Sequence, residues 1–193
     1  GWVVGVTCRL TGRRVAGRLW VTRPEGEAGW ERAGSTRRSG AATTLPAPPA
    51  GVRQRRLTFT HQRAYPGLVN VPRHWVRSHP QGTQIAFLMR DDRGVVQLWL
   101  IAPEGGEPRQ LTRNASAIQS AFNWHPSGDE LRFVLEGRIA MCDVASGAVT
   151  FLTADHANPP SADAVVFSPD GQYIAWMEEV AGFRQLWITE TYR

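Results

Sequence analysis

The chain has 193 residues, of which 42% are hydrophobic, and its formal net charge at neutral pH is +5. This length and composition predict a globular protein with a hydrophobic core of ordinary size. No apolar run approaches the roughly 20 residues that a transmembrane helix requires, so we expect no membrane span. The first residues show no signal peptide, which leaves a cytoplasmic or a periplasmic location open.

The charged residues and the cysteines narrow the range of partners and ligands. Residues 1–56 contain 11 Arg and 3 Glu, residues 57–193 contain 11 Arg and 14 acidic residues, and Lys is absent. The basic segment lacks the interleaved aromatic residues on which bases stack, which argues against a nucleic acid as the partner. Cys8 and Cys142 have no zinc-site spacing, so we expect two reduced thiols.

Residues 1–58 predict an incomplete unit of β-strands. The segments 2–6, 18–22 and 53–58 have the length of short strands. Residues 23–50 are rich in Gly, Ser, Thr, Ala and Pro, which is the composition of an exposed loop and not of a core element. We therefore interpret residues 1–58 as a partial blade with a long loop at 23–50.

A β-hairpin recurs three times in the remainder of the chain, at Trp75–Phe87, Ala121–Phe133 and Ala164–Met177. Each copy has an apolar strand, a turn that contains Pro and Gly, and a second apolar strand. Proline fixes φ at the second position of the turn, and glycine tolerates the tight backbone conformation with which the turn ends. The three turn prolines are 46 and 43 residues apart, a spacing that is typical of propeller repeats.

These repeats predict an all-β fold, a β-propeller of four-stranded antiparallel blades. We place the blades at about 74–112, 120–153 and 163–193, within a repeat domain at 59–193. The final unit supplies only three strands before the sequence stops. We therefore expect part of a larger ring, whose open strand edges would invite self-association.

The repeats resemble the PD40-type repeats of TolB-like propellers. Their signature, W/F-S-P-D-G followed by L-W/Y and then G-G-E-P-x-x-L-T, is matched at Gln97–Trp99, Gly105–Pro108, Leu111-Thr112 and Phe167–Gly171. The stretches His61–Ser78 and Thr153–Ser161 further resemble the YidR family of enterobacterial TolB-like propellers. The resemblance covers about residues 45–193, whereas residues 1–44 match poorly. It implies an architecture similar to that of oligogalacturonate lyases, but it does not imply an activity.

The five histidines fall into two groups by their place in the predicted blades. His61, His74 and His156 lie on inter-blade connections that open on one face, and His79 and His125 lie in turns at the opposite face. Imidazoles are ligands for divalent transition metals, so the first three form a candidate metal site. The alternative is that these histidines only anchor their loops, since no spacing here has the specificity of HExxH or CxxC. We interpret the other two as turn residues only.

Polar side chains near the first group form a candidate ligand-binding site. Arginine can bind a carboxylate or a phosphate through two parallel hydrogen bonds. The connection from Leu57 to Pro80 spans 23 residues, against 15 for its equivalent in the next unit, and long loops on rigid scaffolds commonly carry function. The candidate residues are His61, Arg63, Tyr65, Arg73, His74, Arg77, Gln119 and Asp163.

Two functions from different classes remain open. The first is a binding or scaffold module whose partner is a protein or an acidic oligosaccharide. The second is a metal-dependent polysaccharide lyase of the oligogalacturonate-lyase type, in which a divalent metal and an arginine would neutralise a uronate carboxylate before β-elimination. Only the family resemblance carries this alternative, because a fold does not imply a function.

Overall fold

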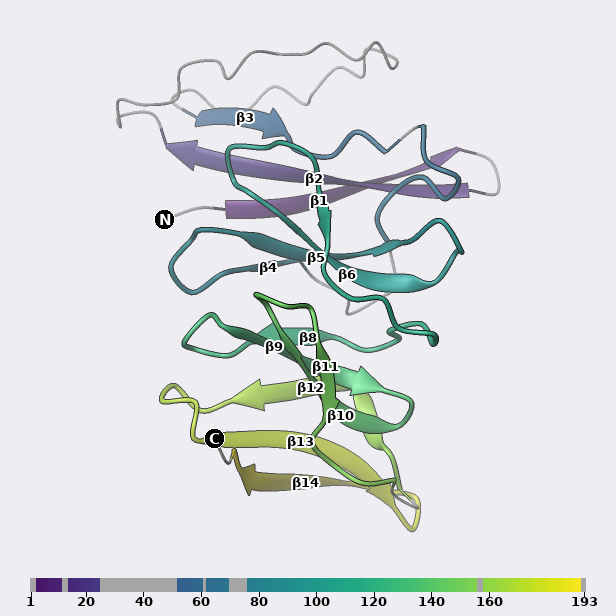
Figure 1. Cartoon of the computed structure of the whole chain (residues 1–193), viewed down its shortest axis with the longest axis vertical. Helices are drawn as coiled ribbons and strands as arrows, with labels where there is room; N and C mark the ends of the chain where they lie inside the picture. Colours follow the sequence, from purple (N-terminus) through teal and green to yellow (C-terminus); the bar gives the residue numbers. More distant parts are fainter. Residues whose placement is uncertain are drawn as a thin grey trace.

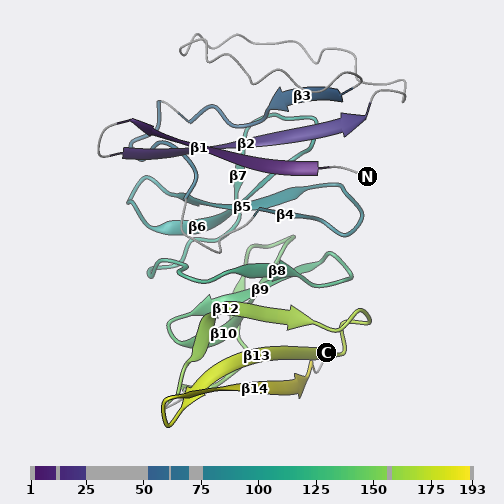
Figure 2. The same cartoon turned by 180° about the vertical axis from the view of Figure 1, so that it is seen from behind.

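The structure is a computed structural model that describes residues 3–11, 14–24, 52–60, 62–69, 76–155 and 158–191. These residues form fourteen β-strands in four antiparallel sheets. Figures 1 and 2 show the sheets stacked in chain order along the longest axis of the molecule. In the ranges given above there is no helix long and apolar enough to cross a membrane. The predicted all-β class is confirmed.

The N-terminal sheet has the strand order β1 (Val3–Thr11), β2 (Arg14–Pro24) and β3 (Val52–Arg56). All of β1 pairs with Arg14–Thr22 of β2, and β3 pairs with the last five residues of β2, Trp20–Pro24. Both strands of this hairpin are longer than predicted, because backbone pairing continues beyond the apolar runs into polar sequence. Residues 25–51, which hold most of the predicted loop, lie outside the described residues.

The other three sheets are meanders in which neighbours in sequence are neighbours in the sheet. Blade 1 contains β4 (Arg77–Ser78), β5 (Ile85–Arg90), β6 (Val96–Ile101) and β7 (Arg109–Gln110). Blade 2 contains β8 (Phe122–Trp124), β9 (Glu130–Leu135), β10 (Arg138–Asp143) and β11 (Val149–Phe151). Blade 3 contains β12 (Pro160–Phe167), β13 (Tyr173–Val180) and β14 (Phe183–Glu190).

The turn between the first two strands closes in the same way in every blade. The N–H of Gly82, Gly128 and Gly171 donates to the carbonyl three residues earlier, at 2.8, 2.9 and 2.9 Å. These glycines have φ values of +74°, +86° and +75°, a region that other L-residues rarely adopt. Positions can therefore be compared between blades by counting from the turn prolines, which are Pro80, Pro126 and Pro169.

Alternate residues of each strand face opposite neighbours, as the pleat of a strand requires. On β5, Phe87 and Met89 pack with Leu57 and Trp99 on one side, whereas Leu88 packs on the other side in the cluster shared with blade 2. Each apolar side chain buried in this way contributes about 1.5–3 kcal/mol relative to an exposed one. The core of the molecule therefore lies between the sheets.

The clusters between adjacent blades differ in size. The larger one joins blades 1 and 2 and includes Leu98, Leu131 and Phe133, all of them fully buried. A smaller one joins blades 2 and 3, where Val134 packs with Trp176. Each blade therefore depends on its neighbour for a covered face.

Candidate functional site

Several predicted site residues cannot be placed. The residues outside the described ranges are His61, Arg73, His74 and His156, and the side chain of Asp163 on β12 is not among those described. The three-histidine metal site therefore stays a prediction. Within the described ranges, no group of three or more His, Cys, Asp or Glu lies close enough together to hold a metal ion.

The described part of the connection that follows β3 is held by hydrogen bonds within itself and by one to blade 1. Thr60 is buried, its hydroxyl accepts from the Gly67 N–H at 2.8 Å, and its carbonyl accepts from the Arg63 N–H at 3.1 Å. The Val69 N–H donates to the Leu88 carbonyl of β5 at 3.0 Å. A connection held in this way presents its outward side chains in a defined geometry.

Arg63 and Tyr65 both contact the hairpin that joins β5 to β6. Arg63 Nη2 lies 3.3 Å from Asp92 Oδ1, and the guanidinium lies over the Trp99 ring, 4.5 Å from its centroid. A Cβ built on Gly94 would lie 3.0 Å from the Tyr65 ring, so the tyrosine packs directly on this glycine. The structure therefore brings these two predicted site residues to one hairpin.

That hairpin is held in shape by the buried carboxylate of Asp91. Its Oδ1 accepts from the N–H groups of Arg93 and Val95, both at 3.0 Å, and its Oδ2 accepts from Arg93 Nη2 at 2.9 Å. Burial raises the pKa of Asp91, but the side-chain hydrogen bond from Arg93 and the two backbone N–H groups together outweigh it and lower the pKa. Asp91 is therefore an ionised structural anchor at neutral pH.

The same connection exposes two aromatic side chains. Phe59 is 56% exposed and Tyr65 is 43% exposed. The Arg56 guanidinium lies over the Phe59 ring, 4.7 Å from its centroid. We call Phe59, Arg63 and Tyr65 the loop surface. Aromatic residues and arginine are the types enriched at the centres of protein–protein interfaces, so this surface has the composition of a contact site.

Among the residues that the structure describes, Arg77 hydrogen-bonds to blade 2 and not to the loop surface. Its Nε donates to Asn123 Oδ1 on β8 at 3.0 Å, and Asn123 Nδ2 donates in turn to the Val165 carbonyl on β12. Burial lowers the pKa of Arg77. This predicted site residue therefore begins a polar chain that joins the first strands of three blades. Gln119 is exposed just before β8.

His79, interpreted from the sequence as a turn residue only, also bridges blade 1 and blade 2. Its Nε2 lies 3.2 Å from the Gly128 carbonyl oxygen, and its ring meets the Trp124 ring edge-on with the centroids 4.8 Å apart. The Gln81 N–H donates to Nδ1 at 3.1 Å, so the ring proton is on Nε2 and is donated to Gly128. A Cβ on Gly128 would lie 2.2 Å from Nε2, so only glycine leaves room for the ring.

His125 repeats this arrangement one blade further along the chain. Its Nε2 lies 3.3 Å from the Gly171 carbonyl oxygen, its ring meets Phe167 edge-on at 5.2 Å, and the Ser127 N–H donates to its Nδ1 at 3.2 Å. We call these two arrangements the histidine latches. Their signal was present in the sequence, because each His-Pro turn is followed one repeat later by an aromatic residue before the proline and a glycine after it.

Two further buried groups belong to the packing between strands and blades. Burial, with the nearby Asp143 carboxylate, raises the pKa of the Cys142 thiol to about 12, so the thiol is not a nucleophile at neutral pH. Arg132 is buried, pairs with Glu130 at 2.9 Å and lies over the Phe167 ring. Neither group supplies an accessible reactive atom.

No protein-family model matches the chain. In sequence, the chain is 65% identical over 200 residues to YidR of Escherichia coli (strain K12). The match covers all of this chain and 47% of YidR, so the chain spans about half the length of that relative. The resemblance to the YidR family is confirmed, and it extends to residues 1–44, which were expected to match poorly.

Among solved structures, TolB from Acinetobacter baumannii superimposes with a TM-score of 0.54 and 22% identity over 72% of this chain and 32% of TolB. Oligogalacturonate lyase from Vibrio parahaemolyticus superimposes with a TM-score of 0.51 and 12% identity over 93% of this chain and 37% of the lyase. Identities this low establish the fold alone. The predicted TolB-like propeller fold is confirmed.

Proposed function

Because this chain is a relative of YidR with the fold of TolB-like propellers, we propose that it acts as a protein-binding scaffold module. The observation that carries the proposal is the exposure of Phe59 and Tyr65 on a connection that is hydrogen-bonded to blade 1. The loop surface is the contact site. The partner is a protein whose apolar pocket receives one of the two rings.

Two physical effects support binding at the loop surface. Aromatic side chains offer a large contact area at a low cost in conformational entropy, because only two χ angles must be fixed. Residues 62–69 of the connection are held in place before any partner arrives, since Gly67 and Val69 are already hydrogen-bonded within the chain. Ordering of a loop on binding, which weakens many interfaces, is therefore avoided here.

The test compares two variants in a capture experiment with extract of Escherichia coli, the source of the relative. The combined Phe59→Ala and Tyr65→Ala variant removes both rings. Tyr173→Ala is the matched control, because Tyr173 is 39% exposed on β13 of blade 3. We expect the unchanged chain and the control to cross-link the same protein. The double variant should cross-link at least tenfold less of that protein. Equal capture by all three chains would contradict the proposal.

The lyase alternative has a separate readout. Likeness to oligogalacturonate lyase at 12% identity is a likeness of fold, so the alternative stands second. Purified chain is incubated with oligogalacturonate and a divalent metal, and the unsaturated product is followed by its ultraviolet absorbance. Product formation that a chelator abolishes would replace the binding proposal with the lyase. No product, together with loss of capture in the double variant, supports the binding module.

A further inference from the structure

Three arginines in the described part of the chain have a buried Nε atom without a hydrogen-bond partner, namely Arg63, Arg132 and Arg138. Arg132 is only 4% exposed, so nothing outside the chain can reach it, and Arg138 Nε lies 3.2 Å from Asp155 Oδ1. The Arg63 side chain is 28% exposed, and the described residues supply no acceptor for its Nε–H. A donor on a charged group that is left without an acceptor is costly, so Arg63 is suited to receive an acceptor from outside the chain.

The unpaired Nε–H lies on the same edge of the guanidinium as the atom that contacts Asp92. Nε–H and one N–H of Nη2 are parallel donors, and a carboxylate that lies in the guanidinium plane can accept from both. Asp92 Oδ1 lies 3.3 Å from Nη2, whereas charge-assisted N–H···O bonds are ordinarily about 2.7–2.9 Å long. Asp92 therefore makes one long contact with an edge that can make two short ones.

The surroundings of Arg63 and Asp92 keep the two groups at this distance. The guanidinium lies over the Trp99 ring, 4.5 Å from its centroid, and Trp99 is itself fixed because its Nε1–H donates to the Met89 carbonyl at 3.0 Å. The backbone on either side of Asp92 is held by the hydrogen bonds of the Asp91 carboxylate. The Asp92 side chain is 86% exposed, and exposed ion pairs contribute little to stability. Arg63 is thus a preoriented guanidinium with a weak, replaceable partner.

We propose that Asp92 holds the place of a carboxylate that the binding partner brings to Arg63. The inference rests on the proposed function, since Arg63 belongs to the loop surface together with Phe59 and Tyr65. The partner is a protein that carries an Asp or Glu side chain beside the apolar pocket that receives a ring. Its carboxylate accepts from Nε–H and Nη2–H together, and the Asp92 side chain turns into the solvent. Because the partner excludes water from the contact, the new ion pair is stronger than the exposed one that it replaces.

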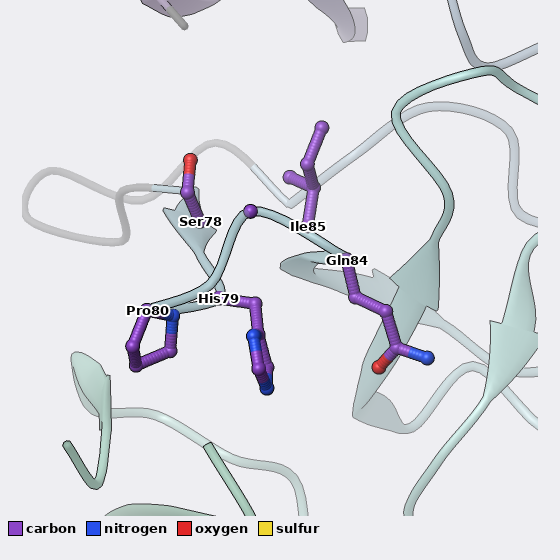
Figure 3. A pocket seen from close by; sticks show the side chains of 6 residues that line it. Ser78, His79, Pro80, Gln84 and Ile85 are labelled. Atoms are coloured by element: carbon purple, nitrogen blue, oxygen red, sulfur yellow. The ribbon is translucent and has the colours of Figure 1, made fainter. Parts of the chain in front are cut away.

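A hollow of about 170 Å³ in blade 1 is not part of this site. It is lined by residues of the turn between β4 and β5, among them Gly82 and Gln84 (Figure 3). This turn lies at one end of β5, and the hairpin that carries Asp92 lies at the other end. A carboxylate bound to Arg63 should therefore leave the turn unchanged, and the backbone amide of Gly82 can serve as an internal reference.

The first test uses the whole chain and acetate as the carboxylate probe. The NMR signal of Arg63 Nε–H, assigned by its loss in Arg63→Gln, is followed at constant ionic strength with chloride as the control anion. We expect acetate to shift this signal saturably and to leave the Gly82 amide unchanged. In Asp92→Asn, which removes the competing carboxylate, acetate should bind about threefold more tightly. No shift at Arg63, or equal affinity in the two chains, would overturn the proposal.

The second test repeats the capture experiment with charge variants. Arg63→Gln should capture about tenfold less of the partner, because the partner's carboxylate loses both donors. Arg63→Lys should not restore capture, since an ammonium group has no parallel pair of donors. Asp92→Asn should capture about threefold more. Arg113→Gln is the matched control and should capture as much as the unchanged chain, because Arg113 is an exposed arginine on the next inter-blade connection.

The outcomes separate this inference from the proposed function. If the combined Phe59→Ala and Tyr65→Ala variant loses capture and Arg63→Gln keeps it, the contact site stands and the carboxylate inference is wrong. If the aromatic variant keeps capture, the proposed function is wrong, whereas saturable binding of acetate would still show that Arg63 is a carboxylate site. Digalacturonate that binds at Arg63 about tenfold more tightly than acetate would assign the carboxylate to a uronate and would overturn the protein source. If Arg63→Gln does not fold, Arg63→Lys and Asp92→Asn still decide the outcome.

Discussion

Blade 1 and blade 3 have the same strand pattern, but blade 1 is covered on both faces and blade 3 on one. Leu98 on β6 and Leu186 on β14 are equivalent, because they pair with Leu88 and Met177, each eight residues after its turn proline. Leu98 is 0% exposed, whereas Leu186 is 77% exposed. Blade 2 covers the first leucine, and β14 lies at the end of the stack (Figure 1).

The comparison shows that burial in this fold is decided by the neighbouring blade and not by the strand itself. The face of blade 3 that carries Leu186 also carries Ile188 and Val166, which are likewise exposed. These are apolar residues of the kinds that are buried in blade 1. The contacts between blades, namely the apolar clusters and the histidine latches, therefore stabilise the fold. Substitutions should cost less free energy of unfolding toward the blade 3 end of the stack.

The largest effect is expected for Leu98→Ala, in the cluster between blades 1 and 2. Removing a fully buried leucine side chain costs the lost burial and leaves a cavity, for a loss of about 2–5 kcal/mol in the free energy of unfolding. The measurement is a urea titration followed by tryptophan fluorescence. A loss below about 1 kcal/mol would mean that the cluster between these blades is not the main source of stability.

The next effect is expected for Gly171→Ala, which tests the second latch. An added Cβ would lie 2.2 Å from Nε2 of His125 and would also be strained at a φ of +75°. We expect a loss of about 2–3 kcal/mol, of which the backbone strain alone accounts for about 1–2. In Gly182→Ala the backbone is strained in the same way, but the added Cβ has no neighbour within 4 Å. This control therefore measures the backbone strain alone. In a His125→Ala background the excess over Gly182→Ala should disappear, and persistence of the excess would assign it to another contact.

A smaller effect is expected for Asp91→Ala, which opens the hairpin under the loop surface. The Arg93 and Val95 N–H groups lose their acceptor, for a loss of about 1–3 kcal/mol. The folded pKa of Asp91 lies below its ordinary value, so its contribution is present above that value and is lost as the pH falls through the folded pKa. Urea midpoints of the unchanged chain should therefore drop more steeply below pH 5 than those of Asp91→Asn. Asp92→Asn is the control, because the Asp92 side chain is 86% exposed. Its urea midpoints should fall with pH as steeply as those of the unchanged chain.

The sequence was sufficient to predict the fold, but it did not predict the contacts between blades. The hairpins predicted at Trp75–Phe87 and Ala121–Phe133 are present, with β5 and β9 as their second strands, because apolar runs and Pro-Gly turns are local signals. The histidine latches join residues 49 and 46 positions apart, so their repeat pattern in the sequence could be interpreted only once the stacking of the blades was known. The contact of Tyr65 with Gly94 has the same origin. Tyr65 was named from the sequence as a candidate site residue, but its packing against Gly94 was not predicted.

The smallest effect is expected for Leu186→Ala, the counterpart of Leu98→Ala at the end of the stack. The side chain is 77% exposed, so its truncation leaves no cavity and removes little buried area. We expect the free energy of unfolding to change by less than about 0.5 kcal/mol, the range of ordinary surface substitutions. The measurement is the same urea titration at two protein concentrations. A larger loss that grows with concentration would show that a second copy covers this face in solution, as expected if open blades associate. A larger loss at both concentrations would mean that the end blade is packed within the chain, and blades 1 and 3 would no longer differ.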